Sequence, residues 1–113
     1  MPRFRGFEVR VTEHQPYDRT ARAVLSTVPS AFEVHSCCER AMQAALARAQ
    51  DTFRREVTIG RRYAARLGAI VREDSTIWAA GYMRHVFHCA SGHRLTVQLR
   101  CVTLREQDAR HIL

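Results

Sequence analysis

The strongest constraint on the fold is a predicted β-hairpin near the C-terminal end of the sequence. Two segments of alternating character, 77–89 and 94–104, flank a short loop at 90–92. A three-residue loop with glycine in the left-handed position is a common hairpin connection, and Gly92 fills that position. The loop fixes the register, because the side-chain period of a strand is two. On one face the expected opposite pairs are Cys89–His93, Phe87–Leu95, His85–Val97 and Met83–Leu99.

Two more strands are expected to join this hairpin. In segment 3–12, apolar and polar side chains alternate from Phe7 to Thr12, which is typical of a half-buried strand. Segment 67–71 also alternates, and the acidic and polar residues at 73–75 predict the turn that follows it. Together with the hairpin, the second segment forms a three-stranded meander.

A long helix is expected between the first strand and the meander. Ser36 and Glu39 match a capping box, in which each side chain bonds the backbone amide of the other residue. Residues 36–55 are rich in helix formers, and their apolar side chains recur at three- and four-residue steps. Gly60 is expected to end this helix. A second, short helix is predicted over 19–28, between a capping aspartate and a proline.

These elements predict an α+β fold in one domain that spans residues 1–113. An antiparallel sheet of about four strands, made of the N-terminal strand and the C-terminal meander, packs on one long helix, with a short second helix. The order of elements resembles the cystatin-like and double-stranded-RNA-binding arrangements. Because no motif of either family occurs in the sequence, the resemblance concerns the order of elements only.

The charge of the chain favours an acidic partner. Eighteen basic residues, all of them arginine, stand against 11 acidic ones, which gives a formal net charge of +7 and a pI near 10.2. Such a field attracts polyanions, and arginine forks bind phosphates and carboxylates. An acidic surface of a protein partner, or of a neighbouring copy in a homo-oligomer, fits the same charge.

The sequence also predicts where the protein works. Its first ten residues contain no apolar secretion core, and the longest apolar run, Ile77 to Met83, is far shorter than the roughly 20 residues of a membrane helix. We therefore expect an intracellular protein of the cytoplasm, nucleus or an organelle matrix, not secreted and not in a membrane. Its four cysteines are expected to be reduced thiols.

The second face of the predicted hairpin carries the candidate binding residues. Rings that stack on bases, combined with arginines, are typical of platforms for single-stranded nucleic acid. Protein interfaces have the same enrichment, and the helix at 19–28 or a second copy of the chain are alternative covers of this face. The register places Tyr82 opposite Arg100, and Trp78 is expected on the same strand, near Leu104. The candidates are Trp78, Tyr82, Arg84, His88, Arg94 and Arg100, with a second basic cluster at Arg54, Arg55, Arg61 and Arg62.

Catalytic and metal sites find little support in the sequence. Cys37 and Cys38 lie at the expected start of the long helix, which favours a thiolate, but burial as a small apolar side chain explains Cys38 better. The hairpin has no Cys-x-x-Cys pair, and strand alternation separates His88 from Cys89 and His85. No phosphate loop, nucleophile elbow or dinucleotide fingerprint occurs. We expect no catalytic residue, metal or cofactor, with thiol chemistry at the two adjacent cysteines as the weaker alternative.

The sequence therefore predicts a non-enzymatic, arginine-rich domain that contacts RNA or single-stranded DNA. An accessory component of a ribonucleoprotein, or of a viral or phage system, is the type of protein that fits. The alternative is a structural or adaptor subunit whose sheet face docks a protein partner or a second copy of the chain.

Overall fold

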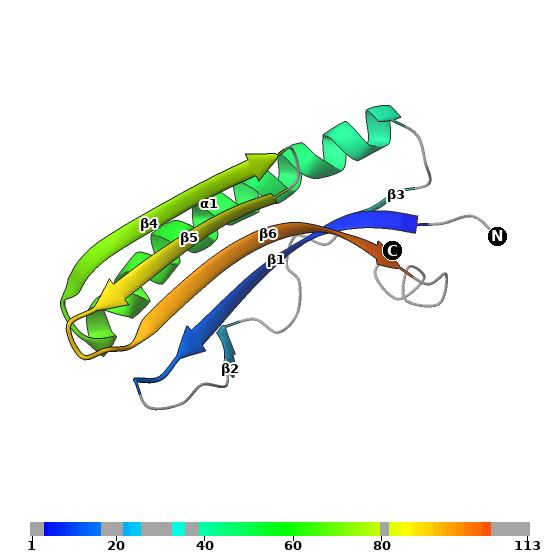
Figure 1. Ribbon diagram of the computed structural model, residues 1–113. Helices are drawn as coiled ribbons and strands as arrows, with labels where there is room; N and C mark the ends of the chain where they lie inside the picture. Colours follow the sequence, from blue (N-terminus) through cyan, green and yellow to red (C-terminus); the bar gives the residue numbers. More distant parts are fainter. Residues whose placement is uncertain (1–3, 17–21, 26–32, 36–38, 80–81, 105–113) are drawn as a thin grey trace.

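The computed structural model describes residues 4–16, 22–25, 33–35, 39–79 and 82–104, which form a six-stranded antiparallel sheet with one long helix on one face (Figure 1). The elements follow in the order β1 (Phe4–His14), β2 (Arg22–Leu25), β3 (Glu33–His35), α1 (Glu39–Leu67), β4 (Ile70–Ala79), β5 (Tyr82–Cys89) and β6 (Arg94–Leu104). The predicted α+β class and the packing of the sheet on one long helix are confirmed.

The strands lie in the order β2-β1-β6-β5-β4, and β3 pairs with β1 on the same edge as β2. The predicted hairpin register is confirmed, with Phe87 opposite Leu95 and Arg84 opposite Gln98. Gly92 has a φ of +90°, the left-handed conformation expected in the loop. Because β1 pairs with β6 along its whole length, the first and last strands of the chain meet in the middle of the sheet.

The core lies between α1 and the sheet. The helix packs on β1, β6 and β5, and alternate side chains of these strands point toward it. Ala45, Ala49 and Ala64 of α1 have no exposed surface, in agreement with the close packing that an alanine-rich stripe allows. Each large apolar side chain that is fully buried contributes roughly 1.5–3 kcal/mol to folding. The largest of these side chains are Phe87, Leu95, Leu99, Val9, Val11 and Val97.

The expected helix end at Gly60 is wrong, because α1 continues to Leu67. Gly60 is buried, and a Cβ atom there would lie 3.3 Å from both Leu95 Cδ2 and Phe87 Cε2. The glycine therefore lets the helix approach the sheet and does not end it. The helix ends before Gly68, whose φ of +149° is a conformation that glycine adopts more readily than other residues.

The predicted turn at 73–75 is also wrong, because β4 runs through it. Glu73 and Asp74 both pair with residues of β5 in the ladder between the two strands. Charged residues are tolerated here, since β4 is an edge strand of the sheet. The chain reverses between β4 and β5 instead, so the expected long strand 77–89 is divided in two.

Part of the predicted short helix is a strand. Arg22–Leu25 is β2, which pairs with β1 between Val11 and Glu13. Helix propensity is overridden here because this segment satisfies the backbone groups on a free edge of β1. Since β2 lies in the sheet, it does not cover the sheet face. The rest of segment 19–28 and the expected helix cap at Ser36 lie outside the described residues.

We expect Gly60→Val to lower the free energy of unfolding by about 1–3 kcal/mol, because the added isopropyl group would press on Leu95 and Phe87 in a close-packed core. Urea denaturation followed by circular dichroism measures the change. Ala65→Val is the matched control, since it adds valine to the same helix at an exposed position, where only the weak helix preference of valine acts. Equal losses in the two variants would contradict the close approach of helix and sheet.

Candidate functional site

Most of the predicted binding residues lie on the sheet face that is turned away from α1, which we call the open face. The strand registers align its side chains in rows that run across β1, β6, β5 and β4. The arginine row consists of Arg10, Gln98, Arg84 and Thr76; the threonine row of Thr12, Thr96, Val86 and Asp74; and the histidine row of His14, Arg94, His88 and Arg72. Neighbouring rows are two residues apart along each strand, or roughly 7 Å.

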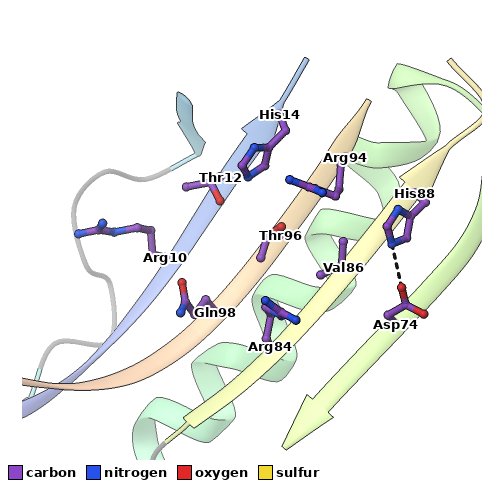
Figure 2. A pocket seen from close by; sticks show the side chains of 10 residues that line it. All are labelled: Arg10, Thr12, His14, Asp74, Arg84, Val86, His88, Arg94, Thr96 and Gln98. Carbon is purple, nitrogen blue, oxygen red and sulfur yellow. Dashed lines mark hydrogen bonds and ion pairs between the residues drawn. The ribbon is translucent and has the colours of Figure 1, made fainter. Parts of the chain in front are cut away.

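The three rows line a hollow of about 480 Å³. Every member of the rows except Thr76 and Arg72 borders it. Figure 2 shows these side chains projecting from four strands on the side away from α1, with Val86 and Thr96 in the middle. The hollow therefore has a small, weakly polar centre with a cationic row on either side.

Two carboxylates of the open face are already paired with arginines. Glu8 Oε1 lies 3.0 Å from Arg10 Nη2 and 3.3 Å from Arg100 Nη2. Asp74 Oδ2 lies 3.2 Å from Arg72 Nε. The negative charges of Glu8 and Asp74 are thus offset by arginines of the same face.

Two further arginines of the open face have no carboxylate partner. Among the described residues, no aspartate or glutamate lies within 4.0 Å of the guanidinium of Arg84 or Arg94. The Nε atoms of Arg84 and Arg100 are buried and have no hydrogen-bond partner in the described part of the chain. A buried donor without a partner costs about 1–3 kcal/mol, and the same holds for the acceptor Glu8 Oε1, which is buried without a hydrogen-bond partner among the described residues.

Trp78 and Tyr82 form an aromatic stack beside the arginine row. Their ring centroids lie 4.4 Å apart, and their planes are 6° from parallel. The guanidinium carbon of Arg84 lies 5.6 Å from the centroid of the Trp78 ring. Gln98 Nε2 donates a hydrogen bond of 3.1 Å to Tyr82 Oη. Because the Trp78 residue is 66% exposed, the stack presents a large aromatic surface to solvent next to two donors of the row.

The structure brings the predicted sheet residues together and corrects the position of one. Trp78 lies on β4 and not on the strand of Tyr82, so the expected neighbourhood of Trp78 and Leu104 is wrong. The two rings meet because β4 and β5 are adjacent and Ala79 pairs with Tyr82. The predicted residues that the open face holds on β5 and β6 are Tyr82, Arg84, His88, Arg94 and Arg100.

The second predicted basic cluster lies on α1, on the other side of the sheet. Arg54 pairs with Asp51 at 3.1 Å, and Arg61 pairs with Glu73 at 2.9 Å. The cluster and the open face therefore do not form one continuous surface. The members of the cluster are Arg54, Arg55, Arg61 and Arg62.

The parts of the open face that β1 and β4 supply were not predictable from the sequence. The alternation of segment 3–12 assigns Arg10 to a polar face, but nothing local indicates that this strand pairs with β6. His14 lies beyond the predicted end of that strand. Arg72 and Asp74 were not predicted as site residues, because the strand was expected to end at residue 71 and to be followed by a turn at 73–75.

A separate cluster on the helix side links the edge strand to α1. Glu73 Oε1 accepts a hydrogen bond of 2.9 Å from Arg61 Nη2 and lies 2.8 Å from His85 Nε2. The bond from Arg61, followed by that from His85, lowers the pKa of Glu73 below its usual value. The Arg61 guanidinium also lies 5.7 Å from the centroid of the Phe87 ring, so one arginine contacts both the core and β4.

The two described thiols differ in their exposure to solvent. Cys89 is buried, its Sγ donates to the carbonyl of Ala64 at 3.3 Å, and burial raises the pKa of its thiol. Cys101 is exposed. Within the residues that the structure describes, no three His, Cys, Asp or Glu side chains gather as metal ligands would. Cys37 and Cys38 lie outside these residues.

None of the helices in the described ranges is long and apolar enough to cross a lipid bilayer. In comparisons with known proteins, no family model, no curated protein and no solved structure matches the chain. The function is therefore argued from the geometry of the open face.

We expect Glu73→Gln to make stability less dependent on pH. Because the pKa of Glu73 is lowered from 4.5 on folding, its carboxylate stabilises the folded state above that value, and the contribution is lost as the pH falls through the folded-state pKa. The wild type should thus be more stable than the variant near neutral pH, and the difference should shrink below about pH 4.

Urea denaturation at a series of pH values measures this difference. Asp51→Asn is the control, because it removes a carboxylate of α1 that is 72% exposed and paired only with a neighbouring arginine. A difference between wild type and Glu73→Gln that stays constant with pH contradicts the assigned role of the carboxylate.

Proposed function

We propose that the protein binds single-stranded nucleic acid, RNA or DNA, on the open face, with a binding and not a catalytic role. One observation carries the proposal. The open face combines a hollow bordered by two arginines that have no carboxylate partner among the described residues and an exposed aromatic stack at its side.

The positions of the two arginines suit a phosphate backbone. Arg84 lies opposite Gln98, and Arg94 is four residues from Gln98 on β6, so the two guanidinium groups start from backbone positions roughly 14 Å apart. Between them, Thr12 and Thr96 offer hydroxyl groups to the hollow. A chain of phosphates that crosses the hollow meets a cation at each end and hydrogen-bonding side chains on the way.

The aromatic stack favours a single strand over a duplex. Bases are free to stack on protein side chains only where they are not already stacked in a double helix, and each such contact is worth about 1–3 kcal/mol. Trp78 is the most suitable ring because it is the exposed member of the stack. Its contact with Arg84 joins the base-binding and phosphate-binding parts of the face.

We expect Arg84→Gln and Arg94→Gln each to weaken the binding of a thymidine oligonucleotide and to reduce the slope of log K against log salt by about 0.7, the value for one single-strand phosphate contact. Fluorescence anisotropy of a labelled oligonucleotide, at several salt concentrations, measures both effects. Binding should also quench Trp78, the one tryptophan of the chain.

The matched control is Arg66→Gln, which removes an exposed arginine in the last turn of α1, on the other side of the sheet. It lowers the net charge by the same amount as the two test variants. If it weakens binding as much as they do, attraction is a matter of net charge alone and the open face is not the site.

A protein partner or a second copy of the chain is the other candidate ligand, and one observation favours it. Val71, Ile77 and Trp78 are each at least 66% exposed, and all three lie on the edge strand β4. Exposed apolar side chains beside unpaired backbone groups are features of docking edges.

This second function makes a different prediction. If β4 docks a second copy, light scattering should report a dimer, and Ile77→Asp should return it to a monomer without loss of oligonucleotide binding. A wild-type protein that stays monomeric at high concentration contradicts the self-association.

A further inference from the structure

The histidine row places two titratable side chains on either side of Arg94, which has no carboxylate partner in the described part of the chain. His14 of β1 and His88 of β5 both lie opposite Arg94 of β6, one on each neighbouring strand. All three line the hollow. Figure 2 shows them together at one end of it, with Arg94 between the two rings.

Burial, and after it a neighbouring cation, disfavours a proton on His14 in the free protein. The ring is partly buried, and Arg94 is the cation opposite it on β6. Burial, and after it the charge of Arg94, lowers the pKa of His14 below its usual value. On β1 itself the adjacent Glu13 is buried on the helix side of the sheet, and the backbone of β2 lies opposite Glu13 at Arg22.

His88 has two competing partners on β4 for the same ring nitrogen. Its Nε2 lies 2.9 Å from Asp74 Oδ2 and 3.3 Å from Arg72 Nη2. A ring nitrogen that carries a proton donates to Asp74, whereas one without a proton accepts from Arg72. When Nε2 carries a proton, the guanidinium of Arg72 no longer donates a hydrogen bond to it. The charged residue opposite His88 on β6 is again Arg94.

We propose that the histidine row is a proton-coupled phosphate subsite, in which Arg94 and the protonated rings of His14 and His88 together hold one phosphodiester group of the nucleic acid. This inference rests on the proposed function and specifies which part of the hollow responds to pH. The arginine row, whose cations do not titrate, supplies binding that is independent of pH.

The coupling follows from the charge of the ligand. A phosphodiester beside Arg94 offsets the repulsion between that arginine and a protonated histidine, so the bound state takes up protons more readily than the free state. By linkage, affinity then rises as the pH falls through the range in which histidine titrates, near 6.5. A rise of about one unit in the pKa of one histidine on binding corresponds to about a tenfold gain in affinity.

The test compares the affinity for a thymidine oligonucleotide at about pH 7.5 and about pH 5.5, at one ionic strength. This probe is suitable because neither thymine nor the phosphodiester changes its charge between these values. We expect about tenfold tighter binding at the lower pH. Calorimetry in buffers of different ionisation enthalpy should record proton uptake on binding at the intermediate pH.

The double variant His14→Gln/His88→Gln should lose the pH dependence, because glutamine does not change its charge between these pH values. His93→Gln is the matched control, since His93 hydrogen-bonds Ser91 in the hairpin loop and does not line the hollow. It should retain the full pH response. Circular dichroism at both pH values checks that each variant is folded.

The outcomes separate the two proposals. If the wild-type protein binds no oligonucleotide at either pH, both the proposed function and the subsite are overturned. If it binds with the same affinity at both values, or if the double variant keeps the pH response, the subsite alone is overturned and binding on the open face stands.

Discussion

The structure depends on the apolar contact between one face of the sheet and the alanine-lined side of α1. Phe87, Leu95 and Leu99 lose all their exposed surface in it, and Gly60 allows the helix to come close enough to cover them. Because strand side chains alternate, a sheet that buries one set of residues must present the other set on its opposite face. The polar rows of the open face are therefore a direct consequence of where the helix packs.

That constraint also explains why the open face is so basic. Five of the 18 arginines of the chain lie on this polar side of the strands, namely Arg10, Arg72, Arg84, Arg94 and Arg100. The two available carboxylates, Glu8 and Asp74, sit at opposite margins of the face and pair with arginines there. The middle of the face contains arginines, threonine hydroxyl groups and the apolar side chain of Val86. This composition is the basis of the proposed binding of an extended anion, and it differs from what a compact metal ion or an apolar ligand requires.

The parts of the fold that local signals determine were predictable from the sequence. The hairpin register followed from the loop that contains Gly92, because loop length and strand period act within a few residues. The pairing of β1 with β6 did not, since it joins segments that are distant in the chain and any exposed strand edge offers the same backbone groups. As a result, Arg84 and Arg94 were found as site residues, whereas Arg10 and His14 were not.

The wrong predictions share a physical cause. Gly60 was predicted to end the helix because glycine, which has no side chain, is common at helix ends. In the structure, the missing side chain instead allows the close contact between helix and sheet. The charged residues at 73–75 read as a turn because such residues prefer solvent, but Arg61 and His85, which pair with Glu73, come from α1 and β5. In each case a partner distant in the chain gives the residue a role that its neighbours do not reveal.

The charges in the middle of β4 have one more consequence, which concerns association. A free strand edge is a template on which other chains add as further strands, and unwanted addition leads to aggregation. Arg72, Glu73 and Asp74 place one positive and two negative charges next to one another on this edge, so an incoming strand must carry matching charges in the correct register. The charged stretch therefore disfavours the addition of an apolar strand along the whole edge, so that association through β4 is limited to the exposed apolar side chains on either side of it, Val71, Ile77 and Trp78.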